Sequence, residues 1–217
     1  MGRPEHIEAV MFDMDGTTID SEGIKNAHLE DLLRAHGGVL ANHELDYLSG
    51  ADLETLLSAI KMVLDRSGVD EDPLAVLRSD TYGRERPYLE PECKPIAGVR
   101  AFISQLREKG IRCALVSSTP TYAVLTALNR FDMVSCFDAI VCGDMISVHK
   151  PDPEAYLTTA RILGVDPARC VVIEDSTSGI KAGIAAGAYV CAYDDGSGVQ
   201  DISAAHERFS SYAHLHL

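Results

Sequence analysis

The chain has 217 residues, of which 46% are hydrophobic and 24% are charged, which suits a packed core and excludes a mainly disordered chain. Its net charge of −14 repels nucleic-acid phosphates and anionic lipid surfaces, so we expect no nucleic-acid partner and no membrane partner. No apolar run reaches the roughly 18 residues that a membrane span requires.

Six cysteines occur in the chain, and none of them forms a CxxC pair. Most lie within or beside apolar runs, and no secretory segment is recognisable ahead of them. Buried free thiols are typical of a reducing compartment, where disulfides are rare. We therefore expect free cysteines and a cytoplasmic protein.

The first 90 residues contain one expected strand followed by helices. Residues 7–12, IEAVMF, are a short apolar run typical of a buried strand, and a turn-rich segment with Gly16 comes next. Helical patterns then predict three helices, at 24–35, 53–64 and 73–84. We expect no strand between residues 20 and 90.

From residue 95 onward, helices and strands alternate. The expected helices are 98–109, 122–130, 153–163 and 178–186, and the expected strands are 111–116, 137–142, 170–173 and 188–193. Such alternation predicts an α/β fold, a doubly wound parallel sheet with helices on both faces. The last residues, 210–217, show no clear pattern.

This order of elements predicts two domains. Residues 1–17 and 93–217 would form the Rossmann-like core, and residues 18–92 would form an inserted all-helical cap. The chain then crosses between the domains twice, at 17–21 and at 88–95. Two linkers side by side make a plausible hinge.

Polar side chains gather at the ends of four expected strands. In a doubly wound sheet, these carboxyl ends line the ligand site. The residues there are Asp13, Asp15 and Thr17 after the first strand, Ser117 and Ser118 after the second, Lys150 in the stretch after the third, and Glu174 and Asp175 after the fourth. Up to four carboxylates would converge, and like charges this close require a cation. Oxygen ligands favour Mg²⁺, with Asp13, Asp15, Glu174 and Asp175 as its candidate ligands.

The remaining groups suit a phosphate. Lys150 offers a point charge, and Ser117 and Thr17 offer hydroxyl donors. Backbone amides near residues 14–16 and at Ser118 add N–H donors. A carboxylate at this site can attack phosphorus to form an aspartyl phosphate, and a second can protonate the leaving oxygen and then activate water.

Four motifs in this order resemble those of the haloacid dehalogenase-like (HAD) hydrolase superfamily. They are DMDGT at 13–17, the apolar strand that ends at Ser117, HKPDPE at 149–154 and VVIEDSTSGIKAGIAAGA at 171–188. The resemblance covers nearly the whole chain. It is greatest to the branch with a helical cap after the first strand, which includes β-phosphoglucomutase and many sugar-phosphate phosphatases. It implies a Rossmann-like sheet of strand order 3-2-1-4-5.

The resemblance also implies roles for the matched residues. Asp13 matches the nucleophile and a metal ligand, and Asp15 matches the general acid/base, its carbonyl being a further ligand. Asp175 matches an acidic metal ligand, and Glu174 matches a neighbour that binds the metal or orients its waters. The matched phosphate binders are Ser117 and Lys150.

Some positions distinguish this chain within the superfamily. The presence of Asp15 favours phosphate-ester chemistry, because the dehalogenases and the phosphonate-cleaving relatives of the superfamily lack an acid at this position. The mutases carry a histidine where this chain has Lys25, and a basic residue follows their cap-loop glycine, where this chain has Ala51 and Asp52 after Gly50. Lys25 and Asp52 are therefore candidates for cap specificity, and Lys25 is a candidate substrate or phosphate contact.

These observations favour a Mg²⁺-dependent phosphatase that hydrolyses a small phosphorylated metabolite, expected to be a sugar phosphate, through an aspartyl phosphate. Two alternatives stay open. One is a β-phosphoglucomutase-like phosphosugar mutase, for which Lys25 would be a poor base, and the other is a non-catalytic phosphate-binding module. We expect a monomer, because two domains already enclose a site.

Overall fold

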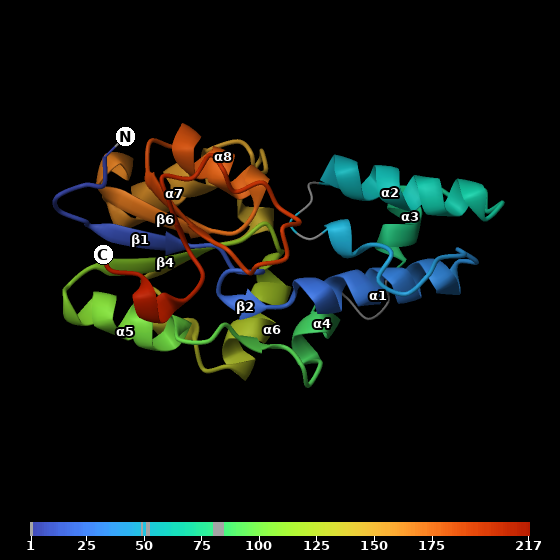
Figure 1. Ribbon diagram of the computed structural model, residues 1–217, viewed down its shortest axis with the longest axis horizontal. Helices are drawn as coiled ribbons and strands as arrows, with labels where there is room; N and C mark the ends of the chain where they lie inside the picture. Colours follow the sequence, from blue (N-terminus) through green and yellow to red (C-terminus); the bar gives the residue numbers. More distant parts are fainter. Residues whose placement is uncertain (1, 49, 51–52, 80–84) are drawn as a thin grey trace.

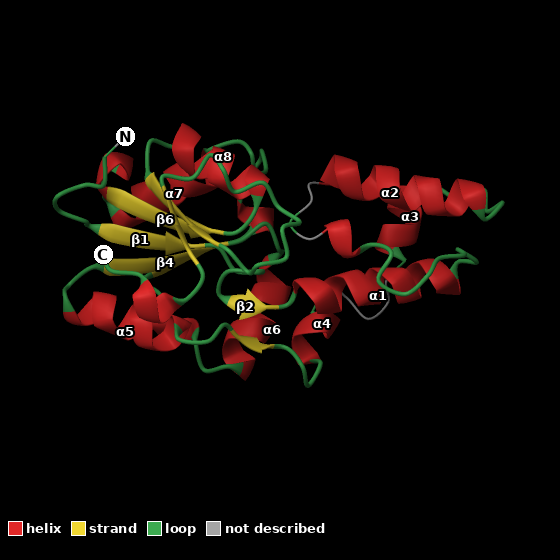
Figure 2. Cartoon of the chain, viewed as in Figure 1, coloured by secondary structure: helices red, strands yellow, loops and turns green. Residues whose placement is uncertain are grey.

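The computed structural model describes residues 2–48, 50, 53–79 and 85–217, and its centre is a six-stranded parallel sheet (Figures 1 and 2). In spatial order the strands are β5 (Ala139–Val141), β4 (Arg112–Val116), β1 (Ala9–Phe12), β6 (Cys170–Glu174), β7 (Tyr189–Tyr193) and β8 (Glu207–Phe209). This arrangement confirms the expected order 3-2-1-4-5 and adds β8 at the edge. β8 is not among the expected strands, because Glu207 and Arg208 are charged and no apolar run marks the segment.

Helices cover both faces of this sheet (Figure 1). One face packs against α5 (Val99–Glu108) and α6 (Thr121–Arg130), and the other packs against α7 (Glu154–Leu163) and α8 (Thr177–Ala185). Alternate residues of β1 belong to different clusters: Val10 and Phe12 join the first, and Ala9 and Met11 join the second. Burial on both faces explains why the strands are continuous apolar runs.

The helices between residues 22 and 79 have a hydrophobic core of their own. They are α1 (Glu22–Ala35), α2 (Leu53–Arg66) and α3 (Pro73–Arg78), and they lie beyond the carboxyl edge of the sheet (Figure 1). Leu33, Ile60 and Val76, one from each helix, are fully buried in this core. The end of the third expected helix, 80–84, lies outside the described residues.

The two segments that connect these helices to the sheet pair with each other. β2 (Ile19–Asp20) and β3 (Lys94–Pro95) form a short antiparallel ribbon, and α4 (Arg86–Leu89) precedes β3. Arg130, at the end of α6, donates to the backbone carbonyls of Tyr88 and Glu90. The returning segment is therefore fastened to a helix that packs on the sheet.

Short 3-10 helices occupy several loops, at η1 (Asp46–Leu48), η2 (Val134–Cys136), η3 (Gly143–Met145), η4 (Pro167–Arg169) and η5 (Tyr212–His214).

All six cysteines are free, and five of them are buried. Within the described part of the chain, no helix combines the length and apolarity needed to cross a membrane.

Candidate active site

The carboxyl ends of the central strands bring the predicted residues together. Asp13 follows β1, Ser117 follows β4, Glu174 ends β6, and Lys150 lies in the loop before α7. Asp13, Ser117, Lys150 and Glu174 are all buried or nearly so. Residues far apart in the sequence therefore form one compact polar cluster inside the protein.

Lys150 joins two of the carboxylates. Its ammonium lies 2.5 Å from Asp13 Oδ1 and 2.7 Å from Glu174 Oε1. It also lies over the ring of Tyr156, 5.0 Å from the ring centroid. Burial alone would lower the pKa of Lys150, but the two carboxylates outweigh burial and raise it well above its usual value. Lys150 is therefore a fixed positive charge beside Asp13.

Glu174 is fully buried and its carboxylate accepts five hydrogen bonds. Lys150 and the Tyr156 hydroxyl donate to Oε1, and three donors from residues 175–176 reach Oε2. Gly179 of α8 makes room for this carboxylate, because a Cβ there would lie 1.6 Å from Oε1. A carboxylate offers about four lone-pair positions, so the hydrogen bonds to Glu174 already occupy them.

Asp15 lies in a different environment from Asp13. Ser21 and Tyr88 donate hydroxyl protons to its Oδ1 at 2.6 and 2.7 Å, and Thr119 donates to Oδ2 at 2.9 Å. Lys25 lies 3.4 Å from Oδ2. Burial favours the neutral acid, but Lys25 and the three hydroxyls outweigh burial and lower the pKa of Asp15.

Asp175 lies against the turn that follows β1. Thr17 is fully buried and donates its hydroxyl to Asp175 Oδ1 at 2.8 Å. Gly16 has a positive φ of 76°, and a Cβ at this position would lie 2.1 Å from Asp175 Oδ2. Glycine is therefore required twice over, by the backbone conformation and by the close approach of Asp175.

Three carboxylates are close enough to share a metal ion. Oxygen atoms of Asp13, Glu174 and Asp175 all lie within 4.8 Å of one another. Burial and repulsion from Glu174 raise the pKa of both Asp13 and Asp175 well above the usual value. A divalent cation would relieve this repulsion, and the all-oxygen donor set suits Mg²⁺. The residues present therefore fit such an ion.

The loop after β4 contains two buried hydroxyl residues, Ser117 and Thr119. Ser117 is buried, and its Oγ accepts a hydrogen bond from the Thr119 N–H at 3.0 Å. Ser118 is exposed. Thr119 instead turns its hydroxyl toward Asp15.

Lys25 extends from α1 to the site. Besides Asp15, it pairs with Glu22 at 2.8 Å, and Glu22 accepts a second hydrogen bond from the Gly50 N–H. The two carboxylates hold the pKa of Lys25 well above its usual value, although burial opposes them. The other cap candidate, Asp52, lies outside the described residues.

Several contacts of the cluster were not expected from the sequence: Ser21, Tyr88 and Thr119 at Asp15, and Tyr156 at Glu174. Tyr88 and Tyr156 belong to helices, and no local pattern marks them. Thr119 carries a partial signal, because it directly follows Ser117 and Ser118 at a strand end.

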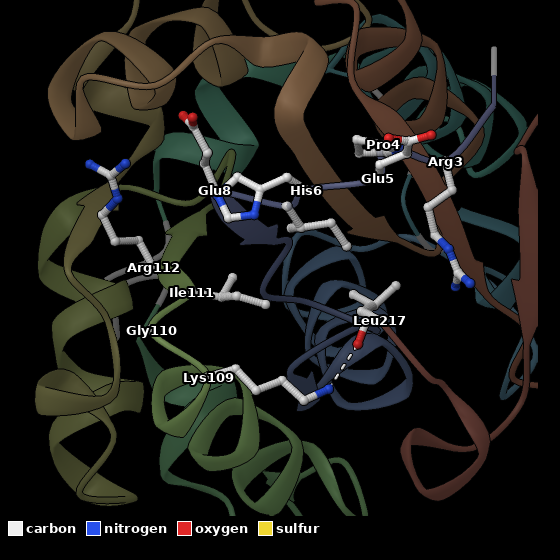
Figure 3. Close-up of a pocket in the computed structure, with 11 residues that line it drawn as sticks. Arg3, Pro4, Glu5, His6, Glu8, Lys109, Gly110, Ile111, Arg112 and Leu217 are labelled. Atoms are coloured by element: carbon white, nitrogen blue, oxygen red, sulfur yellow. Dashed lines mark hydrogen bonds between the residues drawn. The ribbon is translucent and has the colours of Figure 1, made fainter.

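A separate cleft of about 690 Å³ lies at the amino ends of β1 and β4, away from the candidate site (Figure 3). Residues 3–8, residues 109–112 and Leu217 line it. Lys109 donates to the Leu217 carbonyl at 2.8 Å, and Arg3 donates to the His216 carbonyl at 2.6 Å. Lys109 and Arg3 therefore fasten the last two residues of the chain, and none of the predicted site residues lines this cleft.

Comparison with known proteins agrees with the fold. The family model of haloacid dehalogenase-like hydrolases matches residues 10–193. Hexitol phosphatase B of Escherichia coli strain K12 is 34% identical over 191 residues, which are 86% of this chain and 83% of that protein. The phosphorylated carbohydrates phosphatase of Thermotoga maritima is 32% identical over 189 residues, which are 83% of this chain and 82% of that protein.

A solved structure extends the likeness to the backbone. The HAD family hydrolase from Deinococcus radiodurans R1, crystallised with bound phosphate and sodium, has a TM-score of 0.73 and 26% identity, and the match covers 97% of this chain and 93% of that one. The segment matched by the family model contains every predicted site residue from Asp13 to Asp175. The chain therefore belongs to the haloacid dehalogenase-like hydrolase family.

Proposed function

We propose that this chain is a Mg²⁺-dependent phosphatase that hydrolyses a small sugar phosphate through a phosphorylated Asp13. The observation that carries the proposal is the contrast between two neighbouring carboxylates: Lys150 contacts Asp13, whereas hydroxyls and Lys25 hold Asp15. Two carboxyl groups in different environments are typical of a pair with separate chemical roles.

In the first step, an Asp13 oxygen attacks phosphorus while the bond to the ester oxygen breaks, and Asp15 donates a proton to that oxygen. In the second step, a water oxygen attacks the same phosphorus, Asp15 takes up the proton of the water, and Asp13 is released. Lys25 and the three hydroxyls lower the pKa of Asp15 and so favour its ionised form, which is the form that activates water. A phosphate dianion bound beside it would favour proton uptake, because like charges disfavour ionisation.

The other residues would bind the phosphate and hold the reacting groups in place. Lys150 contacts Asp13, and we assign phosphate-binding roles to Lys150, to Ser117, which directly follows β4, and to the exposed residue Ser118. We assign Thr17 a phosphate-loop role through Asp175, which its hydroxyl contacts. Lys25, next to Asp15, is the proposed contact for the sugar that leaves.

Asp13, Asp175 and the carbonyl of Asp15 are the proposed ligands of Mg²⁺. When bound, the ion would neutralise the phosphate and favour its approach to a negatively charged carboxylate. Glu174 can contribute a ligand only by giving up one of its hydrogen bonds. We therefore propose that Glu174 mainly orients Lys150 and the waters around the ion.

We also propose that residues 1–17 with 93–217 form the catalytic core and that residues 18–92 form a cap. The separate cluster of buried side chains in α1, α2 and α3 supports this division. The paired strands β2 and β3 lie at the two crossings, where a hinge would be expected.

The chain is a phosphoric monoester hydrolase of its family, and the names of its relatives support a sugar phosphate as the substrate. Those relatives are a hexitol phosphatase and a phosphorylated carbohydrates phosphatase. Lys25 and Glu22 would offer a charged donor and a charged acceptor to sugar hydroxyl groups.

The test is phosphate release from a panel of hexose, hexitol and pentose phosphates and nucleotides, with Mg²⁺ and with EDTA. Magnesium-dependent release from a few sugar phosphates is the expected result. Release that is unaffected by EDTA would contradict the metal site. Conversion of a sugar phosphate to an isomer without phosphate release would instead indicate the mutase alternative.

A further inference from the structure

Tyr88 lies outside all four motifs, yet its hydroxyl reaches the carboxylate of Asp15. It belongs to α4, the short helix on the returning segment, and is only 1% exposed. Its ring packs in the same cluster as Val10 and Phe12 of β1. The hydroxyl donates to Asp15 Oδ1 at 2.7 Å across 73 residues of sequence.

Donors from three segments hold the Asp15 carboxylate. Ser21 on the outgoing segment and Tyr88 on the returning segment donate to Oδ1, and Thr119 after β4 donates to Oδ2. Each hydroxyl has a single proton to donate. These three hydrogen bonds together restrict rotation of the carboxylate. Tyr88 supplies one of the two at Oδ1.

The backbone of Tyr88 is itself held in place. Arg130 donates to the carbonyls of Tyr88 and Glu90, which ties α4 to the end of α6. Thr119 stands two residues before the first residue of α6. The same helix therefore supports both Thr119 and Tyr88, whose hydroxyl oxygens lie 3.3 Å apart beside Asp15.

We propose that Tyr88 is a positioning residue that holds the Asp15 carboxyl group in line with the leaving oxygen of the substrate. This role rests on the proposed function of Asp15 as the general acid/base. Proton transfer depends on the distance and angle between donor and acceptor. Loss of the Tyr88 hydroxyl would leave the attacking group, Asp13, in place and would misalign only the proton donor.

The test compares two substrates in Tyr88→Phe, which retains the ring and removes the hydroxyl. A sugar phosphate has a poor leaving group that needs a proton, whereas p-nitrophenyl phosphate releases a stable phenolate without one. For the sugar phosphate that the wild type hydrolyses best, kcat/KM should fall about 10- to 100-fold. For p-nitrophenyl phosphate it should fall less than about threefold.

The matched control is Tyr47→Phe. Tyr47 is a half-exposed residue of η1 and is no part of the site, so the control should leave kcat/KM for both substrates unchanged. A second measurement places Tyr88→Phe in an Asp15→Asn background. If Tyr88 acts through Asp15, the second substitution should cause little further loss in single-turnover reaction with p-nitrophenyl phosphate or the sugar phosphate.

Equal losses with both substrates, or no loss with either, would overturn the role of Tyr88 while leaving the phosphatase proposal intact. Full additivity in the double variant would overturn it too, and thermal unfolding of each variant would identify a folding defect as the cause. A wild-type protein that releases no phosphate from any ester would overturn the proposed function and this role with it.

Discussion

At the residue scale, two aspartates two positions apart acquire opposite properties from their surroundings. Burial and the nearby Glu174 raise the pKa of Asp13, whereas Lys25 and three hydroxyl groups lower the pKa of Asp15. The DMDGT motif identifies both residues without distinguishing their environments. The difference comes from side chains that other segments place around them.

Asp13→Asn should abolish phosphate release and leave the protein folded. Activity should fall at least about 1000-fold, as for other removed nucleophiles. Folding should persist because asparagine has nearly the same shape and Lys150 keeps Glu174 as its partner. Steady-state phosphate release and a thermal unfolding curve would test this expectation, and retained turnover would contradict the assignment of Asp13.

Lys150→Met should cost stability as well as activity. It would leave Asp13 and Glu174 buried without their cation, and breaking a buried ion pair costs about 3–5 kcal/mol. The control is Lys61→Met, which breaks an exposed pair with Asp65 of similar length, and little change is expected there. Urea unfolding in EDTA would measure both variants. Equal stability of the two would show that the buried pair does not matter for folding.

At the element scale, Glu30 organises the segment that follows α1. It is 3% exposed and accepts backbone hydrogen bonds from His43 and Leu45 and a side-chain bond from Arg34. Burial opposes ionisation of Glu30, but these hydrogen bonds outweigh it and lower the pKa. A single acidic side chain thereby satisfies two backbone N–H groups of the loop that follows α1.

Glu30→Gln should therefore reduce stability by about 1–3 kcal/mol at neutral pH. Because the pKa is lower in the folded state, the contribution is present above the unfolded value of 4.5 and is lost as the pH falls from there through the folded value. The difference between wild type and variant should therefore shrink in acid. Unfolding curves at several pH values would measure it.

The control for Glu30 is Asp31→Asn. Asp31 is exposed and pairs with the same Arg34. We expect little change from that substitution at any pH. A difference between wild type and Glu30→Gln that stays constant from neutral to strongly acidic pH would contradict the role of the buried charge.

At the scale of the whole molecule, the cores are separate. In the described part of the chain, the buried residues of the helical cluster all lie between Leu29 and Val76, and the buried residues of the two sheet clusters all lie outside 22–85. The ribbon of β2 and β3 holds the two crossings together. In the described part of the chain, residues 22–85 therefore contribute little to the core around the sheet.

Replacement of residues 22–85 by a short Gly/Ser linker should leave a folded core. Ser21 and Tyr88 both contact Asp15, so the two chain ends to be joined are close. Sugar-phosphate hydrolysis should fall more than about 100-fold, because the proposed contacts between the cap and the sugar would be removed, whereas some p-nitrophenyl phosphate hydrolysis should persist. Loss of cooperative unfolding would contradict the proposed division into core and cap.

The sequence by itself determined the α/β class, the run of helices after the first strand and the polar residues that follow the central strands, including Asp13, Lys150 and Asp175. These features follow from local periodicity and from the rule that parallel strands end at one edge. Only the tertiary structure decided how Asp15 is held, that Glu174 is saturated with hydrogen bonds and that β8 extends the sheet. The Tyr88 and Thr119 contacts to Asp15 span 73 and 104 residues. Local patterns carry no information about such contacts, because packing of distant segments creates them.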